Sequence, residues 1–165
     1  MAWMTSGPPH ILGAPSLSAP GGTMLMDLDI QIVGKLLLAS FLGGIVGLQR
    51  ELRHKPAGLR TNMFICIGST LFTLLSDEIA KRLGGDHLRI AAQLIPGIGF
   101  IGAGAILHAG GSVIGLTTAA TIFVVASVGM AIGGGLYMTA VFTTLLVLAV
   151  LSLLGWAETR FGTKE

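Results

Sequence analysis

Long runs of apolar residues alternate with short polar segments along this chain. Five runs are typical of membrane spans, at about residues 30–48, 61–76, 89–108, 113–132 and 137–156. A transmembrane helix needs roughly 20 mostly apolar residues to cross about 30 Å of hydrocarbon. The polar segments leave no room for a second folded unit. The pattern therefore predicts an all-α integral membrane protein with five transmembrane helices.

The segments between the third, fourth and fifth runs are very short. Only residues 109–112 separate the third run from the fourth, which predicts a tight antiparallel hairpin of two helices. The third run is preceded by Asp86, a residue type that favours the N-cap of a helix. Asp86 and Arg89 lie three residues apart at the mouth of this run, where they could form an ion pair.

The third run contains a proline among glycines. Pro96 removes a backbone hydrogen bond from a helix, and four glycines follow it at Gly97, Gly99, Gly102 and Gly104. Two structures fit this pattern. One is a kinked but continuous helix, and the other is a helix unwound near its middle that presents free carbonyl groups to an ion.

One face of the third run has a polar residue at each end and small residues between them. Its members are three or four residues apart and comprise Gln93, Gly97, Ile101, Gly104 and His108. Gln93 in hydrocarbon should find a hydrogen-bond partner on another span, namely Asn62, Thr117 or Thr118. Either this is a simple interhelical bond, or the amides and hydroxyls line a polar pocket.

Glycines also mark the first run. Gly43 and Gly47 form a GxxxG spacing, which lets two membrane helices approach closely. They are therefore predicted to be packing residues. If the contact lies between two copies of the chain, the protein is a structural homo-oligomer.

Residues 97–102 match GxGxxG, the dinucleotide-binding fingerprint. That fingerprint requires a preceding strand, a following helix and an acidic residue about 20 positions later. Here the match lies inside an apolar run, and the next acidic residue is Glu158. Nucleotide binding is rejected, and the glycines are assigned to packing.

Composition supports the membrane assignment and excludes several functions. The chain is 52% hydrophobic and 11% charged, with a mean hydropathy of +0.82, whereas soluble domains average about 25% charged residues. A net charge of +2 gives no reason to expect nucleic-acid binding. No paired catalytic carboxylates, serine–histidine–aspartate set or HExxH motif is present, so the sequence predicts no enzyme and no cofactor.

A magnesium site is not evident either. Mg2+ favours carboxylate oxygens and keeps several of its waters, and no carboxylate lies deep within a predicted span. Mg2+ binding stays an alternative without a clear ligand set.

Orientation follows from the basic residues near the span ends. Four of them crowd the segment after the first run, at Arg50, Arg53, Lys55 and Arg60. Because cytoplasmic loops carry an excess of Lys and Arg, this segment is predicted to be inside. The N-terminus is then outside and the C-terminus inside.

The two ends differ in composition from the body of the chain. Residues 1–25 are rich in Pro, Gly, Ser and Ala and are predicted to be a disordered tail. Met24 or Met26 could be the true start. Residues 26–157 form the predicted membrane domain, and residues 158–165 form a short cytoplasmic tail.

Four motifs in the same order carry a family resemblance: RExxxKPAGLRTN, DxxRIAAQ, GIGFIGAG and GLTTAAT. With them the chain strongly resembles the MgtC/SapB family of bacterial inner-membrane proteins, over about residues 24–156. By these motifs, the polar signature of the family falls on Arg50, Glu51, Arg60, Thr61, Asn62, Asp86, Arg89, Gln93 and Thr118, and Thr117 adjoins it.

The resemblance implies a five-span domain in the bacterial plasma membrane and a role linked to magnesium limitation and, in some pathogens, to virulence. It also implies modulation of another membrane complex, notably the F-type ATP synthase. Four residues depart from the family pattern. His87 replaces a common Pro or Ser, Phe123 replaces a frequent Trp, and the other two are at positions 49 and 96. Gln49 stands where a Glu is usual, and Pro96 where Ser or Thr is usual.

Three functions follow as hypotheses. The leading one is a non-enzymatic membrane protein that contacts a partner complex through the glycines of the third span. The first alternative is a transporter or channel for Mg2+ or another small solute, with Asp86, Gln93, Asn62 and Thr118 along its path. The second alternative is the structural homo-oligomer.

Overall fold

The computed structural model describes residues 22–109 and 112–161. In chain order its elements are α1 (Gly22–Leu52), α2 (Leu59–Leu83), α3 (Arg89–Gly104), β1 (Leu107–Ala109), β2 (Ser112–Ile114), α4 (Leu116–Gly133) and α5 (Tyr137–Phe161). The described chain thus consists of five helices and one short antiparallel hairpin. The predicted all-α membrane class is confirmed.

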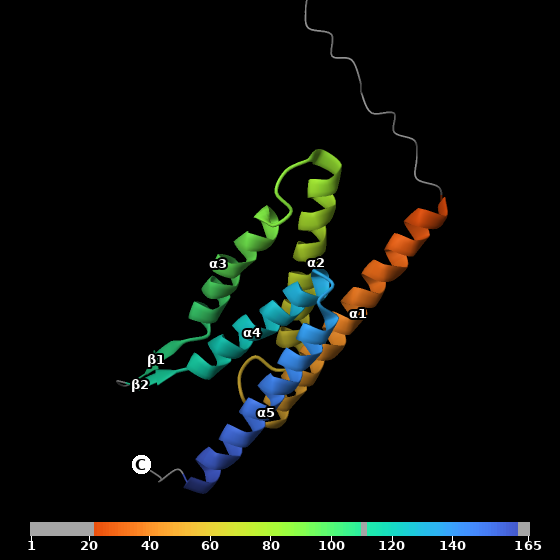
Figure 1. Ribbon diagram of the computed structural model, residues 1–165. Helices are drawn as coiled ribbons and strands as arrows, with labels where there is room; N and C mark the ends of the chain where they lie inside the picture. The colour runs from red at the N-terminus through yellow and green to blue at the C-terminus, as the bar shows by residue number, and fades with distance from the viewer. Residues whose placement is uncertain (1–21, 110–111, 162–165) are drawn as a thin grey trace, which may run out of the picture.

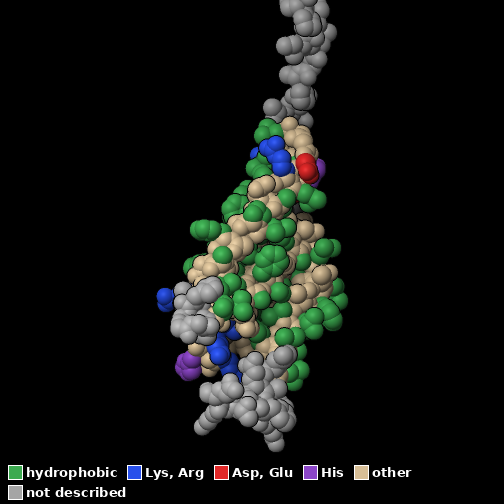
Figure 2. Space-filling model, turned by 90° about the vertical axis from the view of Figure 1, so that its left-hand side faces the viewer, with side chains coloured by type: hydrophobic (Ala, Val, Ile, Leu, Met, Phe, Trp, Pro, Cys, Tyr) green, Lys and Arg blue, Asp and Glu red, His purple; other side chains and the backbone are tan. Residues whose placement is uncertain are grey.

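Three of the described helices are long and apolar enough to cross a bilayer. They cover Ile30–Leu52, Leu59–Leu83 and Leu116–Gly133. α3 has only 16 residues, which corresponds to about 24 Å at 1.5 Å per residue. Charged side chains gather at both ends of the face in Figure 2, and hydrophobic side chains cover the length between them. This distribution fits a molecule whose middle lies in hydrocarbon.

α4 lies at the centre of the bundle. It packs against each of the other four helices. α1 and α2 lie close together near the loop that joins them and diverge toward their other ends (Figure 1). Its Val125, Val128 and Ile132 join a core that includes Val46 of α1 and Cys66 of α2. A smaller cluster of Ile98, Ile122 and Ala126 attaches α3 to α4. α3 is therefore held mainly along one side.

The third span is continuous but shorter than predicted. α3 runs through Pro96 without a break, so the unwound alternative is wrong for this structure. The helix ends at Gly104 rather than His108, because helix propensity is low across glycines 102 and 104. His108 belongs to β1 and pairs with Val113 of β2. The predicted tight link between the third and fourth spans is thus a β-hairpin, and α4 begins at Leu116.

Other helix ends also differ from the sequence prediction. α1 begins at Gly22, so residues 22–25 are helical rather than part of a disordered tail. α2 continues past Ser76 to Leu83. α5 runs to Phe161, four residues into the predicted tail. Residues 1–21 and 162–165, which hold the rest of both predicted tails, lie outside the described residues.

The connection from β2 to α4 depends on a glycine. Gly115 has φ +98°, which is the left-handed region, and a Cβ there would collide with the Ala105 carbonyl at the end of α3. We expect Gly115→Ala to destabilise the protein by more than the roughly 1–2 kcal/mol that a left-handed alanine costs alone. Gly135→Ala is the matched control, since Gly135 has φ +80° and nothing within 4 Å of a Cβ. Thermal unfolding in detergent measures both, and equal losses would contradict the collision.

Candidate functional site

A buried arginine dominates the polar groups where α1, α2 and α4 meet. Arg50 is only 4% exposed. Its Nη2 donates to Thr118 Oγ1 at 2.6 Å and to the Pro56 carbonyl at 3.2 Å. The Nε atom of Arg50 is buried without a hydrogen-bond partner among the described residues. The guanidinium therefore ties α1 to the first turn of α4 and to the α1–α2 loop.

Glu51 acts on the start of α2 rather than on Arg60. Its Oε2 accepts a hydrogen bond from the Leu59 backbone N–H at 2.9 Å. Gly58, the N-cap of α2, has no capping side chain, so Glu51 satisfies a free N–H at the positive end of the helix. Glu51 and Arg60 are not within ion-pair distance of each other.

Asn62 holds the loop that precedes α2. Its side chain is fully buried, and its Nδ2 donates to the carbonyls of Ala57 and Gly58, the latter at 3.0 Å. Ala57 has φ +56°, a conformation that is uncommon outside glycine. Asn62 therefore secures a strained turn and does not reach Gln93. Thr61 and Thr117 are both exposed, and the Thr117 carbonyl accepts a hydrogen bond from Thr121.

Asp86, predicted at the mouth of the third run, makes a hydrogen bond within its own turn. Asp86 Oδ1 accepts from the Leu88 N–H at 2.8 Å, and Leu88 rather than Asp86 is the N-cap of α3. The cap prediction is thus wrong by two residues, because the aspartate forms a turn of its own. Asp86 and Arg89 are not within ion-pair distance of each other.

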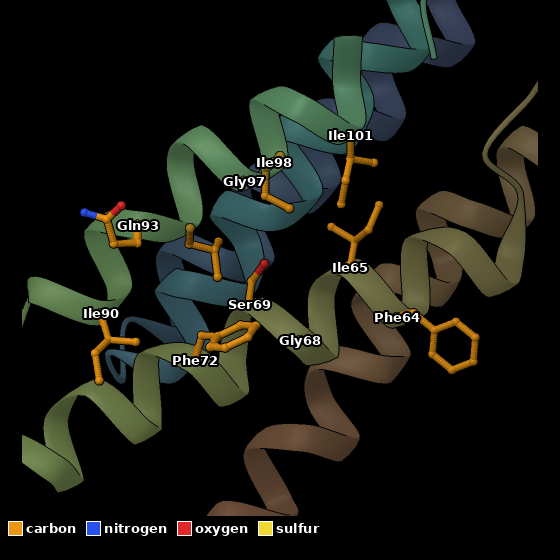
Figure 3. A pocket seen from close by; sticks show the side chains of 11 residues that line it. Phe64, Ile65, Gly68, Ser69, Phe72, Ile90, Gln93, Gly97, Ile98 and Ile101 are labelled. Carbon is orange, nitrogen blue, oxygen red and sulfur yellow. The ribbon is translucent and has the colours of Figure 1, made fainter. Parts of the chain in front are cut away.

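Gln93 lies in a groove between α2 and α3. The cavity has a volume of about 540 Å³ and is lined by Phe64, Ile65, Gly68, Ser69, Phe72, Ile90, Gln93, Leu94, Gly97, Ile98 and Ile101. Ile101 and Ile65 point toward one another across it (Figure 3). Gln93 is exposed and bonds to none of Asn62, Thr117 and Thr118. Gln93, Gly97 and Ile101 share the predicted face, whereas His108 lies outside α3 on β1. Both the interhelical bond and the polar pocket are wrong, because apolar side chains line the groove.

The glycines of α3 differ in their surroundings and do not form one packing surface. Gly102 packs against the Ala119 side chain of α4, with 3.6 Å from a Cβ to that methyl. Gly97 lines the groove. A Cβ at Gly97, Gly99 or Gly104 meets nothing within 4 Å, so these glycines do not serve close packing inside the chain.

The glycines of α1 do serve close packing inside the chain. A Cβ at Gly43 would lie 2.7 Å from the Asn62 carbonyl oxygen, and one at Gly47 would lie 2.7 Å from Leu59 Cα. α1 therefore packs on α2 through these two positions. Because the contact is within one chain, Gly43 and Gly47 are no handle for a homo-oligomer.

Sequence reasoning missed a second glycine pair and two polar contacts. Cβ atoms at Gly129 and Gly133 would come within 3 Å of α2. Thr70 Oγ1 donates to the Gly129 carbonyl at 2.9 Å. Lys35 Nζ donates to the Gly133 carbonyl at 3.0 Å and so satisfies the end of α4. The GxxxG spacing of Gly129 and Gly133 was a signal that could have shown the α2–α4 contact.

The described residues include no group of three His, Cys, Asp or Glu side chains that could hold a metal ion. The residues of the polar signature lie in three separate places. Arg50 and Thr118 bond to each other, Asp86 lies just before α3, and Gln93 lines the α2–α3 groove.

Comparisons with known proteins agree with the motifs. The profile of the MgtC family matches residues 36–160. The chain belongs to the MgtC family. It is 43% identical over 144 residues to the putative magnesium transporter YhiD of Escherichia coli K12, covering 84% of this chain and 67% of the relative. No solved structure matches it.

Two further relatives extend the family comparison. Protein SapB of Bacillus subtilis is 40% identical over 142 residues, which are 82% of this chain and 61% of SapB. Protein MgtC of Brucella abortus strain 2308 is 43% identical over 118 residues, 70% of this chain and 48% of that protein. The chain thus matches about half to two thirds of the length of these MgtC-family relatives.

Proposed function

We propose that this chain is a non-enzymatic, multi-pass protein of the bacterial plasma membrane, linked to magnesium limitation, that modulates another membrane complex through helix contacts. Family membership and the name of the Escherichia coli relative, putative magnesium transporter, support the link to magnesium. The basic segment after α1 supports an orientation with the N-terminus outside and the C-terminus inside.

The observation that carries this proposal is the outward face of α3. This face is formed by small residues that are all exposed, namely Ala92, Pro96, Gly99 and Ala103. Phe100 beside them is 82% exposed, and a Cβ at Gly99 meets nothing within 4 Å. Since membrane helices associate through small residues that let backbones approach closely, a helix of another protein is the occupant we propose. The F-type ATP synthase is the candidate complex.

Magnesium transport is the second candidate, favoured by the name of the Escherichia coli relative. The placement of its residues argues against it. Thr118 contacts the buried Arg50 guanidinium, and a dication next to a buried positive charge is repelled strongly where the dielectric constant is low. Asn62 is fully buried, and Gln93 lies in an apolar groove. We therefore place modulation before transport.

The test replaces Gly99 with leucine and asks whether the chain still restores growth of a deletion strain at low Mg2+. We expect Gly99→Leu to lose growth restoration and crosslinking to the ATP synthase at normal abundance, because the added side chain separates the helices. Gly34→Leu on α1 is the matched control, since a Cβ there also meets nothing within 4 Å. We expect the control to behave as wild type.

Two results would contradict modulation. One is equal growth and equal crosslinking for Gly99→Leu and Gly34→Leu. The other is a saturable Mg2+ flux into liposomes that contain only this protein, above the flux into empty liposomes, which would move the function to transport.

A further inference from the structure

A row of residues leads into the α2–α3 groove from the N-terminal end of α3. Arg89, Gln93, Gly97 and Ile101 follow each other at intervals of four residues and so share one face. Gln93, Gly97 and Ile101 line the cavity. Arg89 is exposed one turn before them. The face thus changes along the helix from charged, to hydrogen-bonding, to apolar.

We propose that this groove binds one acyl chain of a glycerophospholipid, with the lipid phosphate at Arg89 and an ester carbonyl at Gln93. The chemistry changes along a phospholipid in the same order as along this face of α3. The site lies apart from the outward face with Gly99 and does not depend on the proposed function.

Contacts between α2 and α3 place Arg89 and Gln93 at the membrane depths expected for a lipid phosphate and an ester group. Ser76 on α2 donates to the His87 carbonyl at 2.6 Å and accepts from the Ala91 N–H at 3.3 Å, so Ser76 lies level with the start of α3. Asp77 and Glu78 come next on α2 and pair with Lys81 and Arg82, which marks the boundary with water. Gln93 lies one turn, about 6 Å, beyond Arg89 toward the hydrocarbon. This is the level at which ester groups lie below phosphates.

Charge complementarity points to the phosphate. Lys81 and Arg82 are already paired with carboxylates, whereas Arg89 has no carboxylate within ion-pair distance among the described residues. An arginine presents several N–H donors that match phosphate oxygens. Of Lys81, Arg82 and Arg89, only Arg89 is therefore without a described carboxylate partner and open to a lipid headgroup.

The Gln93 amide points to an ester carbonyl. Gln93 is exposed at the groove and no described group bonds its amide, and an amide that faces hydrocarbon costs free energy unless it is bonded. An ester carbonyl can accept from the amide N–H. Beyond it, a Cβ at Gly97 or Gly68 meets nothing within 4 Å, so both glycines leave open the space an acyl chain would fill. The volume of about 540 Å³ lies within the range of about 300–1,000 Å³ typical of ligand sites.

The experiment titrates the full chain, purified in a mild detergent, with phosphatidylglycerol or phosphatidylethanolamine and measures bound lipid by native mass spectrometry. We expect one tightly held lipid per chain. Gly97→Leu fills the groove and should abolish this adduct. Gly99→Leu is the matched control on the same helix, and it should keep the adduct because Gly99 faces outward.

Two further variants test the polar contacts. Arg89→Gln should lower the affinity for both lipids, because the phosphate is common to both. The expected loss is about tenfold, that of one charge-assisted hydrogen bond. Gln93→Leu should lower the affinity for both lipids about fivefold, which is the effect of losing one neutral hydrogen bond. A loss confined to phosphatidylglycerol would overturn the assignment of Arg89 to the phosphate.

The remaining outcomes would overturn the site as a whole. Equal lipid adducts for Gly97→Leu and Gly99→Leu would mean that only annular lipid is bound. A dimer that Gly97→Leu dissociates, seen in place of a lipid adduct, would mean that a second copy fills the groove.

Discussion

Gly47→Val is expected to prevent α1 from docking on α2 and to leave little folded protein. The Cβ alone would lie 2.7 Å from Leu59 Cα and 2.8 Å from the Gly58 carbonyl oxygen. These are backbone atoms at the start of α2, so no side chain can rotate to make room. Overpacking a core usually costs about 1–3 kcal/mol, and we expect at least the upper end here.

Gly34→Val is the control for this substitution. Gly34 lies on the same helix and meets nothing within 4 Å of a Cβ, so the control carries the same change in helix propensity without a collision. The measurements are the monodisperse fraction on a sizing column and the thermal midpoint in detergent. Equal behaviour of the two variants would show that α1 and α2 do not pack as described.

Asn62→Leu should destabilise the protein by about 2 kcal/mol, since two hydrogen bonds of about 1 kcal/mol each are lost. The replacement is similar in volume but leaves the carbonyls of Ala57 and Gly58 without the Nδ2 donor. The turn with Ala57 at φ +56° then loses the side chain that holds it.

Thr61→Val is the control for Asn62→Leu, because Thr61 is exposed and adjacent. Unfolding in a denaturing detergent measures the difference between the two variants. We expect Asn62→Leu also to expose the α1–α2 loop to proteolysis earlier than the control. A stability equal to that of Thr61→Val would mean that the two bonds contribute nothing net.

The packing of Gly43 and Gly47 changes how oligomers should be studied. Bulky residues at both positions cannot report on association between copies, because they would first separate α1 from α2 of one chain. Variants on the outward face of α3 are the informative ones. Gly99 lies on this face, and a Cβ there meets nothing within 4 Å.

The sequence by itself determined the class of the protein and the order of its helices. Twenty-residue apolar runs with little charge have few stable structures other than membrane helices, because every backbone group must be bonded within the segment. The motifs also determined the family, since four of them recur in the same order. These features are local in the chain, so they can be seen without knowing which helices touch.

Only the tertiary structure decided what each polar or small residue does. Gly97 and Gly99 are two residues apart, yet one lines a groove and the other faces outward. Gln93 was expected to meet Asn62, Thr117 or Thr118 and bonds to none of them. Asn62 is buried against its own loop instead. Arg50 was assigned to the water boundary by its charge, but it is buried and bonded to Thr118. A glycine or an amide fits several environments at similar cost, so its role depends on which neighbouring helix reaches it.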